Sequence, residues 1–193
     1  MARGSRATRR RLVANAALSK MKMPMSDAVT LRSLSASDLP AVAALHSTVF
    51  GPGRFARTAY RVREQCGAVS GLVSPFCGVA VSGNHLIASV TFTPICVGTH
   101  NGVLLLGPLA VHPDYAGLGY GRSLVAQSIE AARSAGIKAI ILVGDVPYYG
   151  RFGFKAVPPG QIAFPGPVDQ NRILCLELLD GALVQLRGAV TAT

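Results

Sequence analysis

Three alternating glycines stand directly before a segment with helical periodicity. Gly117, Gly119 and Gly121 lead into a helix that the pattern predicts over about residues 122–135, and Gly136 is suited to its C-terminal cap. Glycines leave closely spaced backbone N–H groups uncovered, and a helix N-terminus adds about half a positive charge. This combination is suited to binding an anion such as a pyrophosphate.

Alternating glycines also occur in plain tight turns, so the loop has to be considered in its context. A dinucleotide-binding Rossmann site would place such a loop after the first strand, with an acidic residue about 20 positions later. Here the loop follows roughly the fourth predicted strand, and Asp145, the acidic residue nearest to that distance, belongs to a different motif. The sequence therefore disfavours dinucleotide binding.

An apolar strand is predicted over residues 103–111, immediately upstream of the loop. Gly107-Pro108 interrupts it. Because proline has no N–H to donate to a neighbouring strand, this pair predicts either a bulge or a strand that separates from its neighbour. Residues 112–115 then leave the sheet.

The surrounding chain alternates strand-like and helix-like periods, which indicates an α/β (α+β) fold. A short strand is predicted over residues 29–35, and Ser37 is a candidate N-cap for a helix that continues to Phe50. A second, more basic helical segment covers about residues 55–66. Two further strands joined by a turn at Gly83-Asn84 form a predicted hairpin.

The net charge of +10 is concentrated at the N-terminus. Residues 1–26 contain seven basic residues and no acidic residue, whereas residues 27–193 contain twelve basic and nine acidic residues. We expect residues 1–26 to be a basic, disordered leader that the folded domain does not need, and residues 27–193 to form a single domain. A nucleic-acid or membrane-surface tail and a targeting segment are the alternatives for the leader.

The composition excludes several classes of protein. Half of the residues are hydrophobic, enough for a sizeable core, and the longest apolar stretches, residues 102–111 and 137–143, are far shorter than the roughly 18–20 residues of a membrane span. The cysteines show no CxxC spacing and no histidine at ligand distance. We therefore expect reduced thiols, a cytoplasmic protein and no metal. The cysteines are Cys66, Cys77, Cys96 and Cys175.

Two stretches together resemble the acetyl-CoA motif of the GCN5-related N-acetyltransferases (GNAT): LAVHPDY at residues 109–115 and GLGYGR at residues 117–122. Residues 146–154, VPYYGRFGF, resemble the family's short helix and following strand, and are similar to a bacterial subfamily of predicted N-acetyltransferases. The resemblance covers about residues 29–180. It implies a central mixed, mostly antiparallel sheet flanked by helices, with a V-shaped cleft for acetyl-CoA.

The resemblance also implies how acetyl-CoA would be held. The backbone of Leu109, Ala110 and Val111 would pair with the pantetheine arm as an added strand. The pyrophosphate would be held by backbone N–H groups of the loop, those of Gly117, Leu118, Gly119, Tyr120, Gly121 and Arg122. The family usually has Gln or Arg at the position of Ala116, so one side-chain contact is missing here. The Arg122 side chain either adds a charge contact or is solvated.

Tyr149 occupies the position at which the family often has a tyrosine that protonates the departing CoA thiolate, and it is the catalytic residue that we expect. Tyr148 is a weaker candidate for that role. The alternative interpretation is that Tyr148, Tyr149, Phe152 and Phe154 form an aromatic cluster with a purely structural role.

The acceptor side of the site is less clear. An alkylamine has to lose a proton before it attacks, so a base is expected. We expect His46, on the apolar face of the first helix, to be buried with a backbone partner, and His112 and Asp114 to be solvated. Glu64 is either a base or an ion-pair partner of Arg61. The basic segment that follows the first helix favours either an acidic acceptor or a solvated surface, through Arg54, Arg57, Arg61 and Arg63.

The expected function is direct transfer of an acetyl group from acetyl-CoA to a primary amine of a small molecule or protein. A ternary complex is expected rather than a covalent enzyme intermediate, because no cysteine is paired with a histidine as a nucleophile. The alternative is a non-catalytic acyl-CoA-binding regulatory module. Neither a membrane nor a nucleic acid is the expected partner, and the oligomeric state stays open, a homodimer included.

Overall fold

The computed structural model describes residues 28–53, 60–62 and 74–193. The expected leader, residues 1–26, lies outside the described residues. So do Glu64, Cys66 and most of the helical segment expected over residues 55–66. Within the described part of the chain, no helix is long and apolar enough to cross a membrane.

The described chain is organised around a nine-stranded sheet whose main order is β1-β2-β3-β4-β5-β8-β6, with β9 beside β3 and β7 beside β9. The β4–β5 and β7–β9 pairs are parallel and the other pairs are antiparallel, which confirms the predicted mixed, mostly antiparallel sheet. The strands are β1 (Val29–Ser33), β2 (Gly78–Ser82), β3 (His85–Val97), β4 (His100–Val111), β5 (Ala139–Val143), β6 (Lys155–Ala156), β7 (Ile162–Ala163), β8 (Ile173–Glu177) and β9 (Gly188–Ala192).

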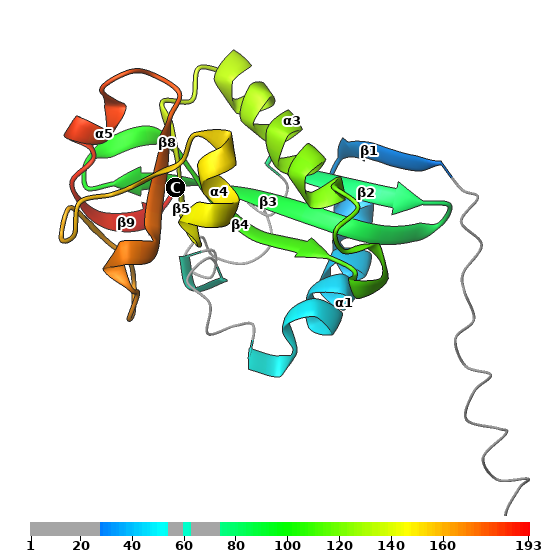
Figure 1. Cartoon of the computed structure of the whole chain (residues 1–193). Helices are drawn as coiled ribbons and strands as arrows, with labels where there is room; N and C mark the ends of the chain where they lie inside the picture. The colour runs from blue at the N-terminus through cyan, green and yellow to red at the C-terminus, as the bar shows by residue number, and fades with distance from the viewer. Residues whose placement is uncertain (1–27, 54–59, 63–73) are drawn as a thin grey trace, which may run out of the picture.

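Two longer helices lie on opposite sides of this sheet, α1 (Leu39–Phe50) and α3 (Tyr120–Ser134) (Figure 1). On one side, His46 of α1 hydrogen bonds to Ser89 of β3. On the other side, Leu124 of α3 lies against Gly78, which pairs with Val90, the next residue along β3. Because successive side chains of a strand point to opposite faces, these contacts agree with the view in Figure 1. Two single-turn helices complete the fold, α4 (Val146–Tyr149) and α5 (Ala182–Gln185).

The feature that positions the site is the separation of β4 from β5. Their pairing ends at Leu105↔Ile141, although β4 continues to Val111 against β3. Just beyond that point, the single residue Thr91 of β3 stands opposite two residues of β4, Gly107 and Pro108. This is the bulge that the sequence predicts. The extra residue shifts the alternation of β4, so that Leu109 and Val111 contact the first turn of α3.

Alternate residues of β4 and β5 divide between two hydrophobic cores. Leu104 and Ile140 join the cluster that contains Leu124 and Ile129 of α3. Leu105 and Ile141 join a second cluster, whose other members come largely from the C-terminal elements. The second cluster includes Val157, Ile162, Phe164, Ile173, Leu186 and Val190. Both faces of the central strands are therefore buried, and this holds the ends of β4 and β5 at fixed positions.

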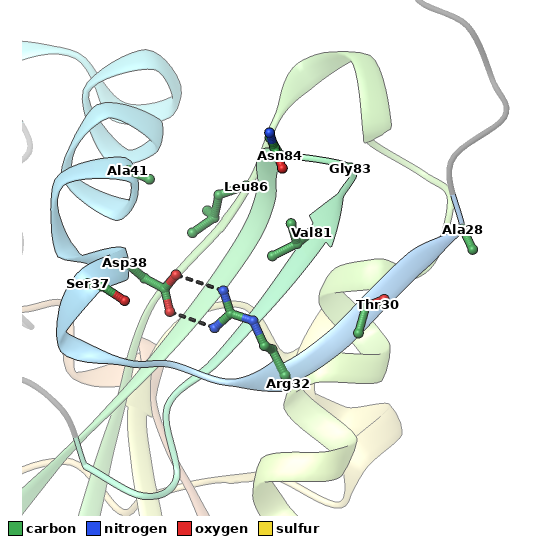
Figure 2. Close-up of a pocket in the computed structure, with 10 residues that line it drawn as sticks. All are labelled: Ala28, Thr30, Arg32, Ser37, Asp38, Ala41, Val81, Gly83, Asn84 and Leu86. Atoms are coloured by element: carbon green, nitrogen blue, oxygen red, sulfur yellow. Dashed lines mark hydrogen bonds and ion pairs between the residues drawn. The ribbon is translucent and has the colours of Figure 1, made fainter.

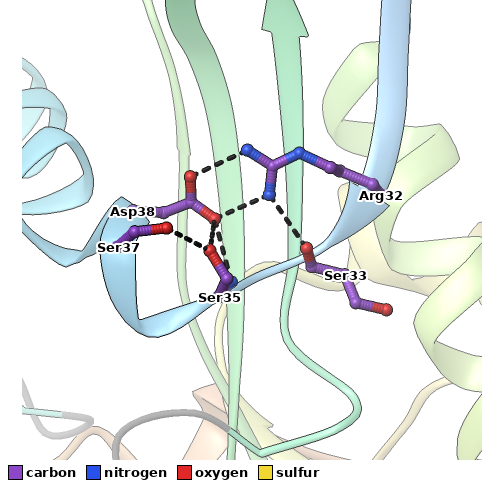
Figure 3. Close-up of polar contacts among 5 residues, drawn as sticks. All are labelled: Arg32, Ser33, Ser35, Ser37 and Asp38. Carbon is purple, nitrogen blue, oxygen red and sulfur yellow. Dashed lines mark hydrogen bonds and ion pairs between the residues drawn. The ribbon is translucent and has the colours of Figure 1, made fainter.

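The start of α1 differs from the sequence prediction. Ser37 is not the N-cap, because a 3₁₀ turn, Ala36–Asp38, precedes the helix and is preceded by Ser35 in extended conformation. The Asp38 carboxylate accepts hydrogen bonds from the Ser35 N–H at 2.8 Å and from the Ser35 hydroxyl at 2.8 Å. It also forms a two-pronged ion pair with Arg32 of β1 (Figure 3). Arg32, as the strongest of these contacts, lowers the pKa of Asp38 well below its ordinary value.

Other local predictions are confirmed with small shifts. The turn at Gly83-Asn84 joins β2 to β3, with Ser82 opposite His85. Gly136, with φ 74°, follows α3, and the chain closes the helix with a hydrogen bond from the Ile137 N–H to the carbonyl of Ala132. α3 begins at Tyr120, slightly earlier than predicted.

Candidate active site

A cavity of about 290 Å³ lies where β4 and β5 separate. Two tyrosines reach it from distant parts of the chain, Tyr60 after α1 and Tyr149 at the end of α4. Its other walls come from the bulged part of β4, the end of β5, the end of α1 and the segment that precedes β8. These walls are formed by Phe50, Leu105, Leu106, Gly107, Pro108, Leu109, Val143, Pro167, Val168, Asp169 and Arg172.

Part of the β4 backbone faces the gap and part of it faces β3. The His112 N–H donates to the carbonyl of Ile87 at 2.8 Å, so His112 is a hydrogen-bonded partner of β3. Along an antiparallel strand, residues whose N–H and carbonyl face the neighbouring strand alternate with residues whose N–H and carbonyl point away from it. The polar groups of Ala110 therefore face β3, whereas those of Leu109 and Val111 point the other way, to the side from which β5 has separated. Of the three residues that the sequence assigned to the pantetheine arm, Leu109 and Val111 have backbone groups directed into the gap.

The glycine loop adopts the conformation that its residues permit. Gly117 has φ 79°, and Gly119, with φ 90°, is the N-cap residue of α3. Both values lie in the left-handed region that other residues adopt at a cost. The first hydrogen bond of the helix runs from the Ser123 N–H to the carbonyl of Gly119 at 3.0 Å. The N–H groups of the preceding turn, which include those of Tyr120 and Gly121, are thus at the open end of the helix.

The loop and the separated strand meet at Gly121. A Cβ at this position would lie 3.0 Å from Cγ2 of Val111, 3.6 Å from Cδ1 of Leu109 and 3.6 Å from the Tyr148 hydroxyl. The structure therefore brings together the strand residues, the loop residues and the YYGRF segment that the sequence placed in one site. At Gly119, an added Cβ would lie 3.5 Å from a terminal nitrogen of Arg122, so this side chain folds back toward the loop.

Tyr149 is held in the cavity wall by close packing. Its ring stands edge-on to Phe154, with centroids 5.8 Å apart, and to Tyr148 at 4.8 Å. A Cβ at Gly144 would lie 2.6 Å from Cε2 of Tyr149, so only glycine leaves room for the ring. Burial raises the pKa of Tyr149 to about 12, with smaller contributions from Tyr148 and Asp145. The phenol is therefore neutral, with a proton to donate, at neutral pH.

Tyr148 has a different environment, beside the loop. Its half-buried ring lies under the guanidinium of Arg151, whose Cζ is 5.1 Å from the ring centroid. Burial raises the pKa of Tyr148, and Arg151 and Arg122 partly offset that effect. The aromatic cluster proposed as a structural alternative does exist, but the hydroxyl of Tyr148 and the ring of Tyr149 lie at different parts of the cleft.

His46 and His112, the two histidines considered in the sequence, differ in burial. His46 is buried as expected, and both of its ring nitrogens contact side chains: Nδ1 lies 2.7 Å from the Tyr60 hydroxyl and Nε2 lies 3.0 Å from Oγ of Ser89. Sequence reasoning missed Tyr60, which lies in a segment whose helical pattern says nothing about the cavity. His112 is half-exposed, and its Nδ1 accepts from the Asp114 N–H at 3.3 Å, where it stabilises the turn that leads into the loop.

A second, larger pocket of about 710 Å³ lies between β1, the β2–β3 hairpin and the start of α1 (Figure 2). Figure 2 shows Arg32 reaching from β1 to Asp38, and these two side chains neutralise each other there. The pocket includes no residue of the glycine loop and none of the cavity at the β4–β5 gap. The residues that the resemblance assigns to acetyl-CoA therefore lie at the β4–β5 gap and not in this larger pocket.

The cysteines of the described chain are not placed for nucleophilic catalysis. Cys77 and Cys175 are buried and Cys96 is half-buried, and the Cys77 sulfur hydrogen bonds with the backbone of Phe92. Burial raises the pKa of the Cys175 thiol to about 12, and Glu177 adds to that shift. Within residues 28–53, 60–62 and 74–193, no cluster of His, Cys, Asp and Glu could hold a metal ion.

The comparison with known families agrees with this geometry. Residues 40–154 match the model of the acetyltransferase (GNAT) family. The chain belongs to this family. The matched region runs from α1 through the glycine loop to the residue that follows the YYGRFG segment, and so contains most of the cavity wall.

Individual GNAT proteins are similar over most of the chain. The Escherichia coli K12 protein named uncharacterized N-acetyltransferase YhbS is 28% identical over 154 residues, which is 79% of this chain and 89% of that protein. The crystal structure of Escherichia coli YhbS in complex with CoA superposes with a TM-score of 0.72 at 25% identity, covering 87% of this chain and 91% of that one. A GNAT acetyltransferase from Brucella melitensis, solved with acetyl-CoA, has a TM-score of 0.66 at 24% identity, covering 86% and 97%. The predicted GNAT fold is confirmed.

The contact between Gly144 and Tyr149 makes a prediction about stability. In this GNAT protein, Gly144→Ala is expected to lower the free energy of unfolding by about 1–3 kcal/mol, because the new methyl group overpacks the Tyr149 ring and also Cδ1 of Leu142, at 2.8 Å. Urea unfolding measures the change. In a Tyr149→Ala background the same substitution should cost clearly less, since the ring is gone, and equal costs in the two backgrounds would show that the ring does not lie against Gly144.

Proposed function

We propose that this protein is an N-acetyltransferase that transfers the acetyl group of acetyl-CoA directly to a primary amine in a ternary complex. The observation that carries the proposal is the meeting of three features at one gap. These are backbone groups of β4 that face the gap, a glycine loop at the N-terminus of α3, and a protonated tyrosine in the wall of the adjoining cavity. Family membership supports the same reaction class.

The residues present fit acetyl-CoA. A Cβ at Gly117 would meet no atom within 4 Å, so the loop is open to solvent beside the N–H groups of the helix N-terminus, and a pyrophosphate can reach those groups. The Arg122 side chain, folded back over Gly119, adds positive charge at the same place. Leu109 and Val111 offer backbone donors and acceptors to the amide groups of a pantetheine arm. When bound, acetyl-CoA supplies an activated acetyl group as a thioester.

The bulge also supplies a donor for the charge that develops on the thioester oxygen. Pro108 has no N–H, so the first N–H of β4 beyond the bulge that faces the gap is that of Leu109. A fixed backbone donor aimed at the oxygen stabilises a developing oxyanion without having to reorient during the reaction, as water must. Leu109 N–H is thus our candidate for this role.

Tyr149 acts in this proposal as a hydrogen-bond donor to the leaving sulfur. With a pKa of about 12, full proton transfer from the phenol to a thiolate whose acid has a pKa of about 8.5 is uphill by about 5 kcal/mol. A hydrogen bond from the neutral hydroxyl to the sulfur requires no such transfer. The raised pKa keeps that hydroxyl protonated throughout the working range.

The cavity favours an acceptor that presents a small amine-bearing end. Its walls combine the apolar and aromatic side chains of Phe50 and Val168 with the polar groups of Asp169 and Arg172. Free amino groups of small molecules and of peptides both have this form. We also propose that the protein acts in the cytoplasm, in keeping with the lack of CxxC spacing among its cysteines.

A first prediction tests where acetyl-CoA binds. Gly119→Val is expected to abolish measurable acetyl-CoA binding in isothermal titration calorimetry, because a branched side chain disfavours φ 90° and fills the loop. Gly136→Val is the matched control, since it introduces the same backbone strain at φ 74° at the far end of α3. Equal affinity of folded Gly119→Val and wild-type protein would mean that the loop is not the pyrophosphate site.

A second prediction tests the tyrosine. Tyr149→Phe retains the ring and removes only the hydroxyl, so acetyl-CoA affinity should hold. A hydrogen bond to a charged acceptor contributes about 1.5–3 kcal/mol, so kcat is expected to fall about 10- to 100-fold. Thiol release is the assay, and a kcat equal to that of wild type would leave Tyr149 with a packing role only.

The function itself is tested by screening amines for acetyl-CoA-dependent release of free thiol. The expected result is thiol release that requires an amine and is accompanied by an acetylated product in mass spectrometry. Tight acetyl-CoA binding without amine-dependent release from any class of amine would favour the alternative, a non-catalytic acyl-CoA-binding module.

A further inference from the structure

The first observation is a buried histidine with both ring nitrogens engaged by side chains. His46 is 4% exposed. Its Nδ1 lies 2.7 Å from the hydroxyl of Tyr60 and its Nε2 lies 3.0 Å from Oγ of Ser89, which is fully buried on β3. The three side chains come from α1, the segment after it and β3. They form a continuous hydrogen-bonded chain from the edge of the cavity into the protein.

The second observation is where this chain ends. Tyr60 lines the cavity at the β4–β5 gap, together with Tyr149 and Leu109. Phe50 lines it too, and its ring centroid lies 5.8 Å from that of His46, so an aromatic side chain separates the imidazole from the cavity. His46 itself is not in the wall. A group bound in the cavity could exchange a proton with His46 through the Tyr60 oxygen.

The proton positions follow from the donors available. A phenol is a better hydrogen-bond donor than a neutral imidazole N–H, so we assign the Tyr60 hydroxyl as donor to Nδ1. Nε2 then carries the ring proton and donates it to Oγ of Ser89. In this arrangement Nδ1 has a lone pair directed at the Tyr60 proton. The tautomer is therefore the one that can accept that proton.

We propose that Tyr60 is the catalytic group that removes the proton from the acceptor amine, and that His46 is the positioning residue that receives the Tyr60 proton. This inference rests on the proposed function. Before the attack, the ammonium form of the acceptor passes one proton to the Tyr60 oxygen, as the Tyr60 proton passes to Nδ1 of His46. The neutral amine then bonds to the acetyl carbon and the carbon–sulfur bond breaks. The second nitrogen-bound proton goes to the departing sulfur, which leaves as the thiol. The resulting imidazolium keeps Nε2–H on Ser89 and returns its extra proton to solvent, through Tyr60, after the product leaves.

The other charged and titratable groups around the chain have different partners. Asp169 accepts a hydrogen bond from the Asn171 N–H at 3.0 Å, and Arg172 pairs with Asp145 at 3.2 Å. Arg61, next to Tyr60, lies against Gly166. Tyr149 is the proposed donor to sulfur. Asp169 is thus the competing candidate for a base, and the experiment includes it.

The tautomer can be tested without an acceptor. In the ¹⁵N-labelled full chain, two-bond ¹H–¹⁵N spectra distinguish Nε2–H from Nδ1–H imidazole, and the chain has only four histidines to assign. We expect the Nε2–H form for His46, with an Nδ1 shift that moves in Tyr60→Phe and does not move in Asp169→Asn. An Nδ1–H tautomer, in protein that binds acetyl-CoA, would overturn the relay and leave the proposed function standing.

The kinetic test uses two amines of different basicity. Ethylamine is protonated at pH 7 and needs a base, whereas methoxyamine is neutral at pH 7. In both Tyr60→Phe and His46→Gln, kcat/KM with ethylamine is expected to fall at least about 100-fold, as for loss of a general base. With methoxyamine the loss should be less than about tenfold. Acetyl-CoA affinity should stay at the wild-type value, and His85→Gln, at an exposed histidine, is the control.

The pH profile separates a proton-transfer role from a packing role. With ethylamine, wild-type kcat/KM should be nearly level at higher pH and decrease at lower pH, because protonated His46 cannot accept from Tyr60. In His46→Gln it should instead fall about tenfold for each pH unit over the whole range, because only the free amine then reacts. Equal losses with both amines and an unchanged profile would show that the pair only supports the cavity wall. A selective loss with ethylamine in Asp169→Asn alone would make Asp169 the base. Failure of wild-type protein to bind acetyl-CoA would instead contradict the proposed function.

Discussion

The site depends on one constraint in the sheet, namely that β4 cannot remain paired with β5 beyond Leu105. The bulge places two residues of β4, Gly107 and Pro108, opposite the single residue Thr91 of β3. The residues of β4 beyond the bulge are therefore shifted by one position relative to those that pair with β5. β5 meanwhile continues against β8 as far as Val143. Because β4 is held by β3 and β5 is held by β8, the two strands diverge beyond Leu105. A gap with exposed backbone hydrogen-bonding groups is the consequence.

The remaining parts of the site are arranged along that gap. Because the bulge shifts the alternation of β4, Leu109 and Val111 meet the first turn of α3, and this contact sets the glycine loop beside the open strand. Gly144 follows β5 and leaves room for the Tyr149 ring. The two hydrophobic cores on either face of the sheet make the gap a rigid feature, so little conformational entropy has to be lost when a ligand fills it.

The elements that the sequence predicted are those defined by local chemistry. The Gly83-Asn84 turn, the end of α3 at Gly136 and the bulge at Gly107-Pro108 each follow from what glycine or proline does to the nearby backbone. The N-cap of α1 was wrongly placed at Ser37, because the ion pair with Arg32 and the Ser35 N–H fix Asp38, which is the N-cap residue. The contact between His46 and Tyr60 had no sequence signal, since it depends on how two segments fold over β3. The direction of the Ala110 backbone likewise required the register of the ladder.

Residue-resolved amide hydrogen exchange with and without CoA tests the central claim most directly. The account predicts that CoA slows exchange at Leu109 and Val111, whose N–H groups face the gap. Exchange at Ala110, whose N–H faces β3, should already be slow and should change little. Binding of CoA that leaves Leu109 and Val111 exchanging at their unliganded rates would contradict the claim that the separated strand holds the acyl donor.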